Sequence, residues 1–338
     1  MPTEAAAPLL SRVADALYWI GRYLERAENA ARLLDVHSGL AADGVALPVD
    51  WDQLIELARD GMEYPANWPR DEASVARFVV HYPGNPNAIV STLTMARENA
   101  RGVRGTISSE MWEQINSLYW AVRGEVEAGR WATHAHVFLQ SVKQGAHLFH
   151  GLAEETMLQD EGDTFIRLGK CLERTVNTLR LVEVKHRGLS GPDGHPDLAR
   201  CAATLKMCSA FEACRRWYAA PVEPRRVVEF LLLNAHFPRS ALWSATHAAE
   251  DARAIALHSP AAREVERQFG ALRAQLEFAD VDELLQSGGL NAFLSSARER
   301  AWSAERALHG SFFLRDDRPV YPGRSSFPPL QQQQQQQQ

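Results

Sequence analysis

Apolar residues recur every three to four positions along almost the whole chain, and the alternating runs typical of β-strands are scarce. This spacing predicts long helices at about 11–37, 86–104, 108–128, 133–159, 163–187, 223–234, 238–257, 260–277 and 289–314. It predicts shorter helices near 51–59, 71–80 and 197–219. With 46% apolar residues among 338, these helices can bury a substantial core. We therefore expect an all-α fold.

The second half of the chain repeats the first. Three segments match in the same order: 15–36 with 163–184, 78–101 with 230–253, and, more weakly, 138–144 with 293–299. The offset drifts slowly from 148 to 155 residues, and nine of 22 positions are identical in the first match. This pattern predicts a tandem duplication, with halves of about 10–160 and 161–315 packed as one pseudo-symmetric helical domain.

Composition bounds the environment of the chain. Residues 316–338 carry four prolines and end in eight glutamines, so we expect an extended or disordered tail. A net charge of −6 argues against nucleic-acid binding. No apolar run is long enough to span a membrane, and the N-terminus lacks the apolar core of a secretory signal. These features, with four cysteines and no C-x-x-C pair, predict a cytoplasmic protein.

The first long helix has two covered faces. Opposite its apolar stripe lie four polar residues, together with the aromatic pair Tyr18-Trp19. The four are Arg22, Glu25, Arg26 and Asn29, and the second half repeats the set as Lys170, Glu173, Arg174 and Asn177. A solvated face rarely carries two aromatics, so we expect this one to be buried. It is then either a Glu–Arg network that fixes the register of the halves, or a cleft where arginines hold an anion and glutamates an amine or a metal.

Other candidate sites are weaker. Glu98 and Arg101 face the same side of one helix, near Glu110 and Asn116 of the next. Arg239 follows a proline where a helix opens, which suits either anion binding or capping.

Histidine spacing allows a metal site but does not favour one. His147, His150 and Glu154 share one helix face, yet no H-E-x-x-H or Glu-x-x-His pair occurs. Phosphate-binding, dinucleotide-binding and G-x-S-x-G motifs are also absent from the sequence. We therefore expect no metal and no cofactor, and an independent helical-bundle metalloenzyme is the third-ranked interpretation.

Four segments, 10–36, 96–116, 163–184 and 237–241, resemble signature segments of the bacterial Alpha-E family in their expected order. The resemblance covers about residues 10–315 and implies an all-helical fold. At the positions equivalent to Arg22 and Tyr23, the second half has Lys170 and Cys171, which departs from the pattern of the first half. Genes of this family typically lie beside, or are fused to, a circularly permuted ATP-grasp protein, and near transglutaminase-like proteases. The resemblance thus implies a role in an ATP-dependent system that forms peptide or amide bonds.

The resemblance also carries over site residues by motif. They are Arg22, Glu25, Arg26, Glu28 and Arg32, then Glu98, Asn99, Arg101, Glu110 and Asn116, and in the second half Arg167, Glu173, Arg174 and Arg239. We expect arginines to hold an anion, and Glu25 and Glu98 to orient an amine or act as catalytic base. The expected partners are the ATP-grasp ligase and a transglutaminase-like protein, with no nucleic acid and no membrane. The alternative is a non-catalytic scaffold whose Glu–Arg networks are purely structural.

Overall fold

The computed structural model describes residues 9, 11–42, 50–59, 61–191, 193–257, 262–286 and 288–313. Across these residues the secondary structure is helical, apart from an isolated antiparallel bridge between Ser190 and Pro196. The helices are α1 (Ser11–Ala42), α2 (Trp51–Arg59), α3 (Glu72–Val80), α4 (Ile89–Gly102), α5 (Ser109–Glu127), α6 (Ala135–Thr156), α7 (Glu161–Lys185), η1 (His186–Gly188), α8 (Leu198–Lys206), α9 (Phe211–Tyr218), α10 (Pro224–Leu233), α11 (Ala241–Ala256), α12 (Arg263–Glu277), α13 (Val281–Gln286) and α14 (Leu290–Phe312). The predicted all-α class is confirmed.

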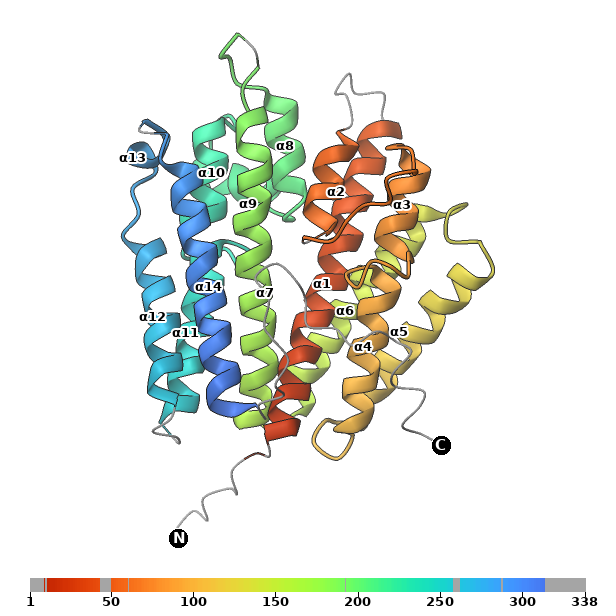
Figure 1. Cartoon of the computed structure of the whole chain (residues 1–338). Coiled ribbons are helices and arrows are strands. Elements are labelled where there is room, and N and C mark those ends of the chain that lie inside the picture. The colour runs from red at the N-terminus through yellow and green to blue at the C-terminus, as the bar shows by residue number, and fades with distance from the viewer. Residues whose placement is uncertain are drawn as a thin grey trace.

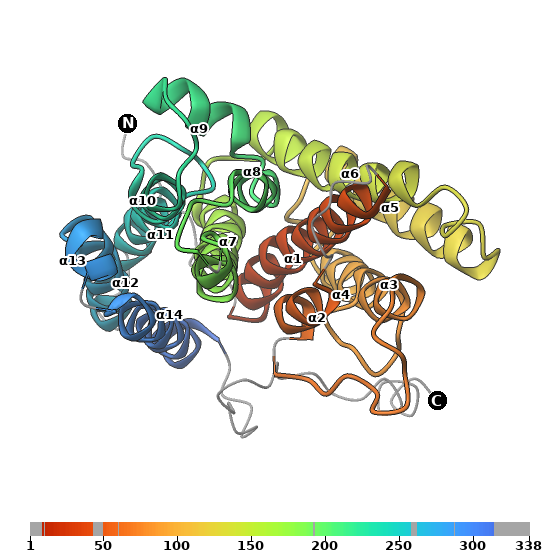
Figure 2. The same ribbon diagram turned by 90° about the horizontal axis from the view of Figure 1, so that it is seen from above.

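Two long helices, α1 and α7, lie side by side at the centre and run in the same direction (Figure 1). Helices α4 and α6 pack against α1, whereas α11 and α14 pack against α7. Seen from above, α2–α6 lie on the α1 side and α10–α14 on the α7 side (Figure 2). This arrangement is what a duplicated chain would give, although the duplication itself stays a prediction.

Glycines let the two central helices approach closely. A Cβ atom on Gly21 of α1 would overlap the carbonyl oxygen of Ile166, and one on Gly169 of α7 would overlap that of Tyr18. Only glycine therefore fits at either position. The next turn of each helix, which carries Glu25 or Glu173, is consequently held inside the interface.

Two elements differ from the sequence prediction. The single helix expected at 197–219 is interrupted between α8 and α9, where Ser209 adopts a φ of 50°. The amide of Ala210 bonds back to the carbonyl of Leu205, which ends α8 in a left-handed turn. The six-residue α13 was not predicted, because one and a half turns carry too little periodicity to be recognised.

The tail expected at 316–338 lies outside the described residues. Of the helices that the structure describes, none is long and apolar enough to cross a bilayer.

Candidate functional site

The interface between α1 and α7 contains two ion pairs in which the helices exchange partners. Arg174 of α7 donates to both carboxylate oxygens of Glu25 in α1, through Nε at 2.9 Å and Nη2 at 2.7 Å. Arg26 of α1 donates to both oxygens of Glu173 in α7, through Nε at 2.8 Å and Nη2 at 2.9 Å. Paired hydrogen bonds of this kind are among the strongest and most directional in proteins. Each Glu-Arg dipeptide thus binds the other one.

Around Glu173 the charges balance. Arg22 donates to Glu173 Oε2 at 2.5 Å and to Glu305 Oε1 at 2.8 Å, and Arg26 also donates to the side-chain oxygen of Asn87 at 2.8 Å. We call Arg22, Arg26, Asn87, Glu173 and Glu305 the Glu173 cluster. It holds two guanidinium groups and two carboxylates, and Arg22 and Glu173 are 5% and 3% exposed. Burial of ions is tolerated when they are paired in this way.

Around Glu25 the charges do not balance. Arg239 donates to Glu25 Oε1 at 2.9 Å and to Glu28 Oε2 at 3.0 Å. Arg32 forms an ion pair with Glu28 one turn away on the same helix. We call Glu25, Glu28, Arg32, Arg174 and Arg239 the Glu25 cluster. Three guanidinium groups face two carboxylates, which leaves one positive charge in excess.

The excess charge perturbs ionisation in the Glu25 cluster. Burial would raise the pKa of Glu25, but Arg174 and Arg239 hold that pKa well below its usual range. Burial and the neighbouring Arg239 lower the pKa of Arg32 to about 9. Burial likewise lowers the pKa of Arg239, with Arg174 adding to the effect. Glu25 therefore stays ionised, while Arg32 and Arg239 lack full compensation.

Two histidines of α6 border the Glu25 cluster. His147 Nε2 lies 3.2 Å from Glu28 Oε1, and its side chain is 58% exposed, so the cluster reaches solvent at this point. Burial and Arg239 lower the pKa of His147 to about 4, and burial also lowers that of His150. Both rings are therefore neutral at neutral pH. Among the residues that the structure describes, the buried Nε2 of His150 and Nε of Arg32 have no hydrogen-bond partner.

A family comparison bears on these pairs. The sequence matches, over residues 9–313, the Alpha-E family, described as "a predicted alpha-helical domain with a conserved ER motif". The chain belongs to the Alpha-E family. In this Alpha-E chain, the two Glu-Arg dipeptides of the central helices are Glu25-Arg26 and Glu173-Arg174, the pairs that exchange partners.

Curated relatives of this Alpha-E chain are mycobacterial. An uncharacterized protein of Mycobacterium bovis is 26% identical over 306 residues, which cover 84% of this chain and 34% of the relative. An uncharacterized protein of Mycobacterium tuberculosis strain H37Rv is 25% identical over 306 residues, with the same coverage. The chain thus spans about a third of the length of these relatives. No solved structure matches it.

The other predicted site residues of the Alpha-E chain lie elsewhere. On α4 and α5, Glu98 pairs with Arg101 at 2.6 Å and with Arg97 at 2.7 Å, and Arg97 also donates to Asn116 at 2.7 Å. Asn99 is half-buried on α4, and Glu110 is exposed in the first turn of α5. Arg167 of α7 pairs with Asp163 and Asp251. Among the residues described, no hydrogen bond or ion pair joins these groups to the Glu25 or Glu173 cluster.

Sequence reasoning missed two members of the Glu173 cluster. In the second repeat match, Asn87 aligns with Arg239, which was a predicted site residue. The alignment could therefore have pointed to Asn87. Glu305 comes from α14, where the repeat is faint, and nothing in its local pattern separates it from a surface residue. Within the described ranges, no three histidine, cysteine or acidic side chains are grouped so that they could hold a metal ion.

Proposed function

We propose that this chain is the helical component of an ATP-grasp-linked system that forms peptide or amide bonds, and that its Glu25 cluster binds the carboxylate of a substrate. The observation that supports this proposal is the excess of guanidinium groups over carboxylates in that cluster. An added carboxylate would bring the cluster to neutrality. Arginine is well suited to the task, because its planar donors match the two oxygens of a carboxylate.

The residues of the Glu25 cluster have different roles in this proposal. Arg239 and Arg32 hold the incoming anion, since these two have lowered pKa values and are the least compensated cations of the cluster. Glu25 positions Arg174 and Arg239, because a carboxylate with a lowered pKa and both oxygens hydrogen-bonded is a weak base. His147 stands where the cluster meets solvent and marks the entry side.

Glu98 serves a different purpose in this proposal. Its side chain is 32% exposed and pairs with Arg97 and Arg101 on the outer part of α4 and α5. An accessible carboxylate can meet the amine of a second substrate or a cationic group of a partner protein. We assign Glu98, Asn99, Arg101, Glu110 and Asn116 to this outer surface.

The partners we propose are a circularly permuted ATP-grasp ligase and a transglutaminase-like protein. Support comes from family membership and from the length of the relatives, which continue well beyond the region that matches this chain. A domain embedded in longer chains acts next to other parts of those chains. The cytoplasm is the compartment we propose, since ATP-dependent ligation takes place there.

A second candidate function is a non-catalytic scaffold. The Glu173 cluster favours it, because its charges balance and every one of its ionic groups is paired within the protein. A network of this kind fixes the register of two helices and leaves no uncompensated charge to bind a ligand. We assign this role to the Glu173 cluster and the binding role to the Glu25 cluster.

Replacement of Arg239 by methionine tests whether the Glu25 cluster has a binding role. The change leaves Arg32 and Arg174 opposite Glu25 and Glu28, so a binding cluster becomes balanced and keeps its stability while substrate binding is lost. The chain is co-purified with the neighbouring ATP-grasp ligase, and ATP turnover is measured with pooled amino acids. We expect Arg239→Met to fold normally, to stay in the complex and to abolish the stimulation of turnover. A complex that turns over ATP equally well with Arg239→Met would contradict the binding role, and absence of a complex would contradict the ligase partnership.

A further inference from the structure

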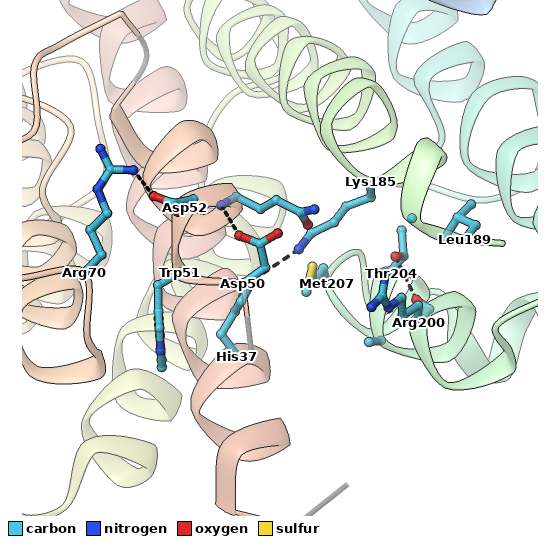
Figure 3. Close-up of a pocket in the computed structure, with 13 residues that line it drawn as sticks. His37, Asp50, Trp51, Asp52, Arg70, Lys185, Leu189, Arg200, Thr204 and Met207 are labelled. Carbon is cyan, nitrogen blue, oxygen red and sulfur yellow. Dashed lines mark hydrogen bonds and ion pairs between the residues drawn. The ribbon is translucent and has the colours of Figure 1, made fainter. Parts of the chain in front are cut away.

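A cavity of about 350 Å³ lies at the end of the central helix pair. It is bounded by the last turns of α1 and α7, the start of α2, and α8 (Figure 3). None of the candidate site residues predicted from the sequence lines it. It is also the right size for a small molecule, since ligand pockets begin at about 300 Å³.

The principal cation of this cavity is Lys185 at the end of α7. Its Nζ lies 3.3 Å from Nε2 of His37, on α1 (Figure 3). The Nδ1 atom of His37 lies 2.7 Å from the carbonyl oxygen of Leu33, which can only accept, so Nδ1 carries the ring hydrogen. The lone pair on Nε2 then accepts one hydrogen bond from the ammonium group. The other two N–H donors of Lys185 are left for a further acceptor.

His37 does not neutralise Lys185. The ring is 2% exposed, and burial together with the ammonium group lowers its pKa to about 3. It is therefore uncharged at neutral pH. Across the residues for which the structure gives positions, no carboxylate forms an ion pair with Lys185. The acidic group that acts on it is Asp50, whose charge raises the pKa of Lys185 but does not outweigh its burial. A largely buried cation with so little compensation is unfavourable, and an anionic ligand would relieve it.

The remaining walls supply a second cation and apolar surface. Arg200 of α8 pairs with Asp197 through Nε at 3.1 Å, and a guanidinium has further N–H donors for a ligand. The ring of Trp51 and the thioether of Met207 line the cavity from α2 and from the end of α8.

Two carboxylates also border the cavity, and both are engaged. Asp52 is paired with Arg70, and Asp50 accepts a hydrogen bond from the amide of Gln53 at 3.0 Å. Neither carboxylate forms an ion pair with Lys185, although the carboxylate of Asp50 lies near the Lys185 ammonium group (Figure 3). The cations that face the cavity are thus only partly compensated.

We propose that this cavity binds a small molecule bearing an anionic oxygen group, a carboxylate or a phosphate, held by Lys185 and Arg200, with Trp51 and Met207 against its apolar part. The site shares no residue with the Glu25 cluster, so it does not depend on the function proposed above. Burial lowers the pKa of Lys185 to about 8, and a bound anion would raise it again.

The four lysines of the chain make a direct test practicable. With ¹³C-labelled lysine, the side-chain ε-carbons give four NMR signals, each assigned by a lysine-to-methionine variant. The full chain is titrated with glutarate, with inorganic phosphate and, at matched ionic strength, with sodium chloride. We expect glutarate or phosphate to shift the Lys185 signal in a saturable way and to raise its pKa, and the two titrations identify which group is preferred. A Lys185 signal that moves with neither probe, or no more than with chloride, overturns the proposal.

Variants locate the effect. Arg200→Gln should weaken the apparent affinity about tenfold, as expected for loss of one hydrogen bond to a charged group, and it leaves the core untouched. Lys206→Met on the exposed end of α8 is the matched control and should leave affinity unchanged. Lys185→Met should abolish saturable binding, measured by calorimetry with the better probe, while circular dichroism verifies its fold. Equal affinity in wild type and Arg200→Gln would remove Arg200 from the site, and equal affinity in a folded Lys185→Met would overturn the proposal.

Discussion

Glu173 of α7 and Arg26 of α1 are 147 positions apart in the sequence, yet they form two parallel hydrogen bonds, at 2.8 and 2.9 Å. Arg22 adds a third bond to the same carboxylate from the same helix. One buried glutamate therefore ties two turns of α1 to α7. This makes the ionisation of Glu173 a direct probe of the helix interface.

Acid should destabilise the protein through Glu173. Burial alone would raise its pKa, but Arg26 and Arg22 outweigh burial and lower the pKa to about 2. A carboxyl whose pKa is lower in the folded than in the unfolded chain contributes stability that is complete above its unfolded value, about 4.5, and is lost as the pH falls toward 2. Urea unfolding from pH 6 to pH 2 should show this loss in the wild type and a flatter curve in Glu173→Gln.

An exposed glutamate provides the control for this experiment. Glu264 also has its pKa lowered to about 2, through hydrogen bonds from Arg267 and Gln268, but its side chain lies in solvent, where water and salt weaken such pairs. Glu264→Gln should therefore follow the wild-type curve. If Glu173→Gln followed it as well, the buried pair would not contribute to acid stability.

Substitution of Gly21 should separate α1 from α7. The Cβ of alanine would overlap the backbone of Ile166, so the helices must move apart, at a cost of about 3 kcal/mol in the free energy of unfolding. Gly39→Ala, in the same helix, is the matched control, because its Cβ would meet no atom within 4 Å. That change should stabilise the protein by about 0.5–1 kcal/mol, since alanine favours helix. Urea denaturation of both variants compares them, and a neutral Gly21→Ala would show that the close approach is not required.

The sequence was sufficient to predict the long helices, the burial of a charged face and the family, but not α13 or the break between α8 and α9. Helical periodicity along the chain predicted the helices, the mixture of aromatic and charged residues at 18–26 predicted the burial, and four segments carried the family resemblance. It did not predict which glutamate meets which arginine. Partner choice depends on how α1 and α7 cross, and the close approach at Gly21 and Gly169 is a tertiary property. The cavity at Lys185 was missed for the same reason, because its walls come from five separated segments.

The two clusters should respond differently to loss of an arginine. Arg26→Met leaves Glu173 and Glu305 with Arg22 alone, and removal of one partner from a buried pair typically costs about 3–5 kcal/mol. Arg239→Met leaves two arginines opposite two glutamates and should cost less than about 1 kcal/mol by the same reasoning. Chemical denaturation of both variants measures the difference. Equal destabilisation would mean that Arg239 is as structural as Arg26.

Alkaline pH should act through Lys185. Its pKa is lowered from 10.5 to about 8 by burial. Between these values the unfolded chain holds a proton that the folded chain has released. The free energy of unfolding therefore rises with pH from about 8 to 10.5, and Lys185 causes no such rise below pH 8. Lys185→Met should remove that rise, whereas Lys206→Met should retain it. Thermal unfolding across this interval tests the sign, and a rise that survives in Lys185→Met would assign it to another group.

The exchange of partners between α1 and α7 also constrains when the protein can fold. Glu25 can bind Arg174 only after 149 further residues have been added, and Arg26 can bind Glu173 only after 147. During synthesis, the completed first half therefore has its central glutamate and arginine in place without their partners. The native core of this chain consequently closes late, when α7 leaves the ribosome, and the first half must stay open until then.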